Sequence, residues 1–144
     1  RGKWKAVFLN TKVKIAIENN PCERKKMRFL QFCEAEELKQ LFRKVKSRYL
    51  GLLLDLGHLN VSANTRKFNK LEFIKQLKSK IFAIHLHDNN GLEDEHKLPD
   101  ASSWIFDLLR KEFSNTRIPM VLESTNLNIG QIVNAAHIFE RNLK

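Results

Sequence analysis

Histidine and aspartate residues gather directly after an apolar segment in the middle of the chain. His85 and His87 lie two residues apart in the segment 81–87, so on a strand their side chains would share one face. Asp94 and His96 repeat this spacing after an Asn-Asn-Gly turn signal. Imidazole and carboxylate groups bind divalent cations or transfer protons. The pattern therefore predicts a metal or acid–base site at the C-terminal end of a buried strand.

Acid or histidine residues also end three other strand-like segments. β-Branched or continuous apolar sequence marks four segments of the chain as strands. A carboxylate at the end of an apolar strand is costly to bury unless it is paired or binds a cation. The four predicted strands, each with its polar residues, are 13–20 with Glu18, 49–58 with Asp55 and His58, 81–87 with His85, and 118–124 with Glu123.

Segments with helical spacing of apolar residues separate these strands. The predicted helices are 34–47, 69–79, 104–113 and 128–142. In the last of them, the residues expected to face the core are Ile129, Ile132, Val133, Ala136 and Phe139. Alternation of strands and helices predicts an α/β fold with parallel strands.

Parallel α/β folds build their sites at the carboxyl ends of the strands. The four polar strand ends are therefore expected to meet at one edge of the sheet. They would offer two glutamates, one aspartate and one histidine to a divalent cation. Such a ligand set suits Mn, Co, Mg or Zn.

The composition fits one globular domain. The chain has 144 residues, of which 42% are hydrophobic and 29% are charged, so it can build a core and is too apolar for a disordered chain. No apolar run approaches the roughly 20 residues of a membrane-spanning helix, and we expect no membrane partner. Two cysteines, Cys22 and Cys33, make no disulfide framework, which favours a reduced compartment such as the cytoplasm.

Charge is distributed unevenly along the sequence. The net charge is +10, and residues 1–48 hold 14 Lys or Arg against 5 Asp or Glu, whereas residues 81–100 hold 1 against 5. A basic surface attracts phosphate groups, so nucleic acid, phosphorylated sugars and anionic lipid are candidate ligands. The alternative is a solvated lysine-rich face that binds nothing.

Five pieces of the sequence, taken together and in this order, resemble the xylose isomerase-like (β/α)8 barrels. This superfamily contains sugar-phosphate isomerases and epimerases and the endonuclease IV type of abasic-site nuclease. The resemblance implies a single TIM-barrel-like domain over residues 1–144 that is incomplete, with about strands four to eight of the barrel and without its N-terminal strands. The matching pieces are Ile15-Ala-Ile-Glu18-Asn19, Leu54-Asp55-Leu-Gly-His58, Ile84-His85-Leu-His87-Asp88-Asn89-Asn90-Gly91, Asp94-Glu-His96-Lys-Leu-Pro99 and Val121-Leu-Glu123.

The resemblance also implies a role for each polar residue. One divalent metal would be held by Glu18, Asp55, His85 and Glu123. In the epimerase-like members, the metal would polarise a carbonyl, and an enediolate would form and collapse through an acid/base pair, here Glu18 and Glu123. Substrate contacts would come from His58, His87 and Asn89. In the nuclease-like members, a further zinc ion would be bound by His58, Asp94 and His96.

The chain departs from the superfamily pattern in two ways. The N-terminal strands are missing, so the chain is either a fragment or completes its barrel with a partner, for example as a homo-oligomer. Family members usually carry Gly-x-Gly after the position of His96, where this chain has Pro99-Asp-Ala-Ser-Ser. A close backbone contact to a substrate phosphate would then be lost.

Three functions stay open on these grounds. The first is a metal-dependent sugar or sugar-phosphate isomerase/epimerase, which the His-x-x-Asp-Asn-x-Gly phrase resembles most. The second is an abasic-site DNA endonuclease, which the basic charge and the Asp94–His96 pair favour. The third is an inactive truncated barrel that only binds metal, sugar phosphate or a protein partner.

Overall fold

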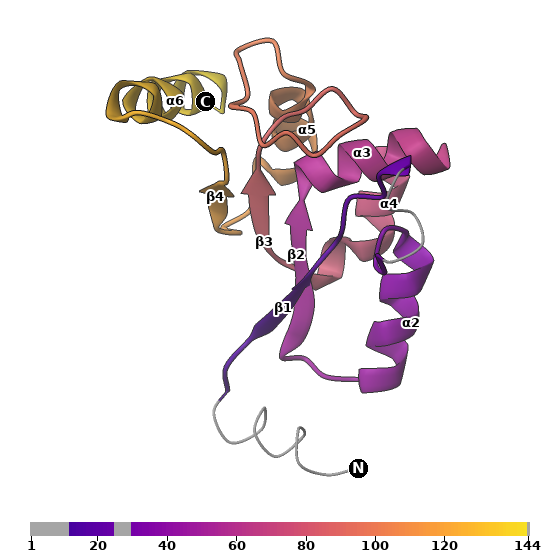
Figure 1. Cartoon of the computed structure of the whole chain (residues 1–144). Helices are drawn as coiled ribbons and strands as arrows, with labels where there is room; N and C mark the ends of the chain where they lie inside the picture. The colour runs from indigo at the N-terminus through magenta and orange to yellow at the C-terminus, as the bar shows by residue number, and fades with distance from the viewer. Residues whose placement is uncertain (1–11, 25–29, 144) are drawn as a thin grey trace.

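The computed structural model describes residues 12–24 and 30–143 of the chain. These residues form a four-stranded parallel sheet whose strands lie side by side in chain order: β1 (Ile15–Glu18), β2 (Leu50–Asp55), β3 (Ile81–Leu86) and β4 (Met120–Leu122). The strands run toward the same end of the sheet, where α3 begins (Figure 1). The predicted parallel α/β arrangement is confirmed, although β1 and β4 are shorter than the predicted 13–20 and 118–124.

Helices connect the strands and supply the other half of the core. They are α2 (Ala35–Val45), α3 (Leu56–Arg66), α4 (Lys70–Leu77) with the 3-10 turn η2 (Lys78–Lys80), α5 (Trp104–Phe113) and α6 (Ile129–Asn142). Buried apolar residues of α2, α4, α5, β2 and β3 belong to one cluster. No helix in the described part of the chain is both long and apolar enough to cross a membrane.

Side chains of β2 alternate between the core and the opposite face of the sheet. Leu52 and Leu54 are buried in the core cluster. Asp55, one residue further along, therefore points to the other face. In the sheet register Asp55 pairs with His85 of β3, so the two polar side chains are neighbours on that face.

The strand predicted over 49–58 is wrong at its C-terminal end. β2 stops at Asp55 and α3 begins at Leu56, so His58 lies in the first turn of a helix. The Asp55 side chain caps this helix, because its Oδ1 accepts a hydrogen bond from the His58 backbone N–H at 2.7 Å. α3 has no counterpart among the predicted helices, since its buried residues do not form a single stripe of helical period.

The prediction for the last helix also needs correction. Ile129 is 81% exposed, and Ile132 and Val133 are each 50% exposed, although all were expected to face the core. Ala136 is exposed as well, and only Phe139 packs against the core cluster as predicted. Within the described residues β4 is the last strand of the sheet, so no further strand covers this side of α6.

A substitution of Ile84 tests the position of the core. It is buried in β3 within the core cluster, so we expect Ile84→Ala to lower the free energy of unfolding by about 3 kcal/mol. Leu92 is 59% exposed, and Leu92→Ala is a matched control that should change this free energy by about 0.5 kcal/mol or less. Urea unfolding followed by circular dichroism measures both. Equal losses in the two variants would contradict the assigned core.

Candidate metal centres

Two groups of metal-ligand side chains meet at the carboxyl end of the sheet. The first, called the carboxylate centre here, takes one residue from the end of each strand. In each group, one ligand atom per residue lies within 4.8 Å of all the others. The carboxylate centre consists of Glu18, Asp55, His85 and Glu123.

His85 stands in the middle of the carboxylate centre. Its Nδ1 lies 3.2 Å from Glu18 Oε1, 3.8 Å from Asp55 Oδ2 and 2.5 Å from Glu123 Oε2. Three carboxylates from three separate strand ends therefore surround one imidazole nitrogen. The negative charges of three carboxylates this close together repel one another unless a cation lies among them.

Asp55 is the most firmly positioned member of this centre. The Asn19 side chain holds its backbone on both sides: Asn19 Oδ1 accepts from the Asp55 N–H at 2.8 Å, and Asn19 Nδ2 donates to the Asp55 carbonyl at 3.0 Å. Because Oδ1 caps α3, Oδ2 is left to point into the centre.

Within the described residues, two buried carboxylate oxygens in this centre make no hydrogen bond of good geometry, although Glu123 Oε2 lies 2.5 Å from His85 Nδ1. They are Asp55 Oδ2 and Glu123 Oε2. An orphaned buried carboxylate oxygen is costly, and a hard divalent cation would satisfy both. The donor set of three carboxylates and one imidazole therefore fits a divalent cation.

Burial controls the protonation of Glu18. Burial raises the pKa of this carboxyl above its ordinary value, and the negative charges of Asp55 and Glu123 raise it further, while His58 and His85 act in the opposite direction. Glu18 consequently holds a proton at a higher pH than an exposed glutamate.

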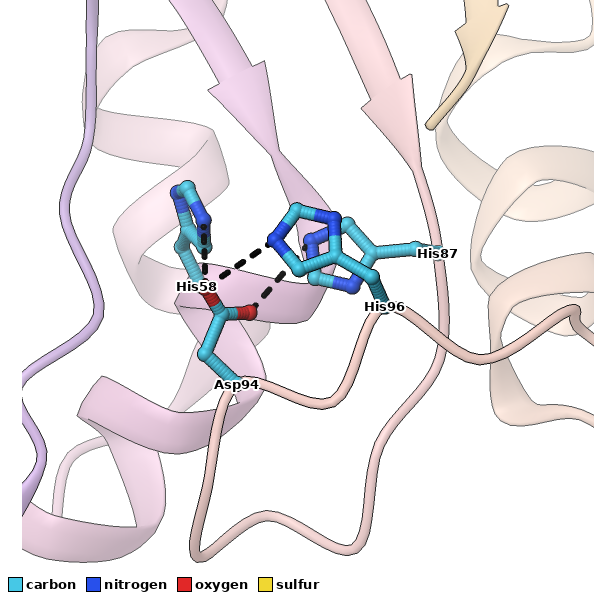
Figure 2. A group of neighbouring side chains, drawn as sticks. All are labelled: His58, His87, Asp94 and His96. Carbon is cyan, nitrogen blue, oxygen red and sulfur yellow. Dashed lines mark hydrogen bonds and ion pairs between the residues drawn. The ribbon is translucent and has the colours of Figure 1, made fainter. Parts of the chain in front are cut away.

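The second group, called the histidine centre here, lies beside the first and is drawn in Figure 2. His58 comes from α3, His87 directly follows β3, and Asp94 and His96 come from the loop beyond it. The imidazoles surround the Asp94 carboxylate. These four residues form the second group of ligand atoms within 4.8 Å.

Backbone carbonyls fix the orientation of two of these histidines. Nδ1 of His58 lies 2.8 Å from the Asn19 carbonyl, and Nδ1 of His96 lies 2.8 Å from the Glu123 carbonyl. A carbonyl only accepts, so each Nδ1 carries the hydrogen. Both Nε2 atoms then face Asp94 Oδ2, at 3.2 Å and 3.1 Å. This is how proteins orient histidine ligands of a metal.

His87 is the least accessible side chain of the histidine centre. It is 0% exposed, and neither of its ring nitrogens makes a hydrogen bond of good geometry to any residue that the structure describes. Its Nε2 lies 2.9 Å from Asp55 Oδ1 and 3.7 Å from Asp94 Oδ1, so His87 stands between the two centres. Its ring occupies space that Gly57 leaves free, since a Cβ there would lie 2.0 Å from His87 Cε1.

The opposite charges of His58 and Asp94 in the histidine centre stabilise each other. Burial acts to lower the pKa of His58, but the hydrogen bond to Asp94 and the charges of Asp55 and Asp94 outweigh it and raise this pKa to about 9. Burial likewise acts to raise the pKa of Asp94, and the hydrogen bond and charge of His58 outweigh it and lower this pKa. Without a cation, a protonated His58 therefore balances the Asp94 carboxylate at neutral pH.

The loop that carries Asp94 and His96 is held at its base. Asp88 and Lys97 pair in an antiparallel bridge, with N–H to carbonyl distances of 2.8 Å and 2.9 Å. The Asp88 carboxylate accepts from the Ser103 hydroxyl at 2.6 Å, which ties the loop to the start of α5. These contacts hold the loop in place. Ser103 belongs to Pro99-Asp-Ala-Ser-Ser103, the segment that stands where superfamily members usually carry Gly-x-Gly.

The structure brings together most of the residues that the sequence predicts for the site. The exception is Asn89, whose side chain donates to the Gly57 carbonyl at 2.9 Å and accepts from Asn60 at 3.0 Å. Asn19 and Gly57 position the centres, yet the sequence gives them no role in the site. Their only signal is their place directly beside Glu18 and His58, respectively, in the motif pieces.

Comparisons with known proteins agree with this architecture. A family model described as xylose isomerase-like TIM barrel matches residues 3–141. A crystal structure of a D-tagatose 3-epimerase-like protein matches with a TM-score of 0.77 at 25% sequence identity, and the match covers 96% of this chain and 49% of that chain.

Curated relatives are longer than this chain. The uncharacterized protein MJ1311 of Methanocaldococcus jannaschii is 29% identical over 133 residues, which cover 92% of this chain and 43% of that protein. The uncharacterized protein y4fM of Sinorhizobium fredii is 29% identical over 87 residues, which cover 59% of this chain and 27% of that protein. The chain thus spans less than half the length of either relative. Because the family model covers nearly all of its residues, the chain belongs to the xylose isomerase-like TIM barrel family and represents about half of such a barrel.

Proposed function

We propose that the chain carries the metal centre of a divalent-metal-dependent sugar or sugar-phosphate isomerase/epimerase. The observation that carries this proposal is the convergence of Glu18, Asp55, His85 and Glu123 at the ends of four parallel strands. The family and the likeness to a D-tagatose 3-epimerase-like protein support a sugar as substrate. The ligand types suit Mn, Co, Mg or Zn.

Glu18 and Glu123 form the acid/base pair in this proposal. Both carboxylates contact His85 Nδ1, and they come from opposite edges of the sheet, so they can approach a substrate from two sides. One of them removes a proton next to the carbonyl, and the other returns a proton to the resulting enediolate. When bound, the divalent cation polarises the carbonyl and stabilises the negative charge of the enediolate.

Substrate contact in this proposal falls to His58. Its side chain keeps 11% exposure, and its Nδ1 lies 3.8 Å from Glu18 Oε1. The resemblance also places His87 and Asn89 against substrate. In this proposal neither contacts substrate, and both instead hold neighbouring residues of the site in position. His87 is fully buried, and the Asn89 amide already holds the Gly57 carbonyl.

The manganese-loaded chain should exchange a carbon-bound proton of D-tagatose, or of another ketohexose, with solvent deuterium. Glu18→Gln and Glu123→Gln should each slow this exchange at least about 100-fold, because an amide cannot accept the proton. Glu140→Gln, an exposed position on α6, is the matched control and should keep the wild-type rate. Proton NMR follows the loss of the carbon-bound signal.

Bound manganese is measured on the same samples by elemental analysis. Loss of exchange in a variant that keeps its manganese identifies an acid/base residue rather than a pure ligand. Wild-type chain that holds manganese but exchanges no proton of any ketohexose or ketohexose phosphate would refute the isomerase proposal for this chain.

The histidine centre favours a second candidate function, a zinc-dependent abasic-site DNA endonuclease of the endonuclease IV type. His58 Nε2, His96 Nε2 and the Asp94 carboxylate offer nitrogen and oxygen ligands that suit zinc. The net charge of +10 would attract the phosphates of DNA. When bound, zinc would activate water for attack on a phosphodiester.

A duplex with one abasic site tests this candidate. The zinc-loaded chain should cleave it, a chelator should stop the cleavage, and the rate should fall steeply as salt is added. His58→Gln should reduce cleavage, whereas His137→Gln, which changes an exposed histidine on α6, should not. Absence of cleavage rules out the nuclease for this chain. If sugar exchange is absent as well, a half-barrel that only binds metal or a partner remains.

The metal-free chain should lose stability as the pH rises from about 6.5 to about 9. The pKa of His58 is raised to about 9 in the folded chain, above the value near 6.5 of an unfolded chain. Protonated His58 therefore stabilises the fold fully below about pH 6.5, and this contribution is lost as the pH passes through the folded pKa. The loss is about 3 kcal/mol, measured by urea unfolding in chelator.

Zinc should reverse this pH dependence. A cation in the histidine centre needs the neutral Nε2 of His58, so stabilisation by zinc should grow as the pH rises. His58→Gln should flatten both profiles, and His137→Gln should leave both unchanged. Equal stabilisation of wild type and His58→Gln by zinc would place the cation elsewhere.

A further inference from the structure

We propose that the surface formed where the four strands begin, called the basic face here, binds the phosphodiester backbone of a nucleic acid. The proposal rests on where the fold gathers positive charge. It holds for either chemistry at the metal centres, because those lie at the other end of the sheet.

Positively charged residues occupy every segment that leads into a strand. Three strands are entered through the same short pattern, Lys-x-Lys or Lys-x-Arg, and β4 is entered through a segment with one Arg. These four entry segments, residues 12–14, 46–49, 78–80 and 114–119, contain no Asp or Glu. Their cations are Lys12, Lys14, Lys46, Arg48, Lys78, Lys80 and Arg117.

The parallel sheet places the entry segments side by side. Neighbouring strands lie about 4.8 Å apart, so the four segments form a row about 14 Å long. The strands begin at the end of the sheet opposite to the loop between β3 and α5, which carries part of the histidine centre (Figure 1). Because the basic face lies at strand ends, further strands beside β1 or β4 would lengthen this row without covering it.

The charged groups of this face are open to a partner. Six of the seven side chains are exposed, and Lys80 is half-buried. Lys14 Nζ lies 5.0 Å from the centroid of the Phe82 ring, so a positive group covers an aromatic surface there. Among the described residues, Lys78 pairs with an acid, Glu112, at 2.9 Å. One acid leaves the face strongly positive.

The helix dipole explains only part of this charge. A helix C-terminus favours cations within its last turn, which accounts for Lys44 at the end of α2 and Lys111 at the end of α5. Lys14, Arg48 and Arg117 lie outside the helices. Like charges placed side by side repel one another, and an anionic partner removes this cost.

Nucleic acid suits the basic face better than an anionic membrane does. Duplex DNA carries one negative charge per roughly 1.7 Å of its axis, so a row of about 14 Å passes about eight phosphates. Binding to a membrane surface takes apolar side chains that enter the bilayer. In the entry segments Tyr49 is buried, and Val13 is the one large apolar residue that is exposed. Phosphate contacts carry no sequence information, so we expect binding without sequence preference.

Fluorescence anisotropy with a labelled random-sequence DNA duplex of about 20 base pairs tests the proposal. Chelator is present, so neither metal centre contributes to binding or cleaves the probe. The full chain should bind with a micromolar Kd at low salt, and the affinity should fall as salt is added. Single-stranded RNA of the same length is measured beside the duplex, and the tighter of the two identifies the source of the phosphates.

Two double variants locate the binding surface. Lys46→Gln with Arg48→Gln should weaken binding at least about 10-fold and lower the slope of log affinity against log salt by about 1.8, because two phosphate contacts are lost. Lys12→Gln with Lys14→Gln, on the neighbouring strand, should do the same. Circular dichroism checks that each variant is folded.

A third double variant is the matched control. Lys67→Gln with Lys97→Gln removes the same charge from exposed residues outside the basic face and should bind as the wild type does. A wild-type chain that binds neither nucleic acid at about 50 mM salt overturns the proposal. Equal weakening in all three double variants overturns the assignment to this face. Binding to phosphatidylserine vesicles without binding to nucleic acid overturns the choice of partner.

Discussion

The carboxylate of Asp55 is the constraint on which both candidate metal centres depend. One of its oxygens caps α3, which fixes the first turn of that helix and the position of His58. The other oxygen points into the carboxylate centre, where no described residue gives it a hydrogen bond. Because Asn19 clamps the Asp55 backbone on both sides, the end of β2, the start of α3 and the two centres form one connected unit. Movement of this single side chain would disturb all of them.

Charge explains why the two centres lie next to each other. The carboxylate centre carries three acids and one histidine, whereas the histidine centre carries one acid and three histidines. A protonated His58 beside Glu18 and Asp55 offsets part of the repulsion among the carboxylates when no cation is present. A cation in the carboxylate centre would take over this role and would release His58 to act as a neutral ligand or substrate contact.

The residue types at the strand ends could be predicted from the sequence, whereas the contacts that hold the site residues in position could not. Glu18, Asp55, His85 and Glu123 each follow an apolar strand, and parallel strands must bring such ends to one edge. His58 is different, because the apolar run continues through Leu56 and hides the point where strand becomes helix. The dependence of His87 on Gly57 cannot be predicted from the sequence, since it arises where the first turn of α3 meets the residue that follows β3. The exposed face of α6 escaped prediction because helical periodicity indicates an apolar stripe but not whether the same chain covers it.

Ligand binding and barrel closure place separate demands on this chain. All four residues of the carboxylate centre come from one chain and already converge there, so the candidate ligands meet without any contribution from a partner. The proposed isomerase reaction would ask for more, because proton transfer to and from a bound sugar would need a site from which bulk water is excluded. The interior face of an open four-stranded sheet leaves Val121 half exposed and Glu123 near an edge. Cation affinity would therefore be largely a property of the single chain, whereas turnover would depend on whatever closes the sheet between β4 and β1.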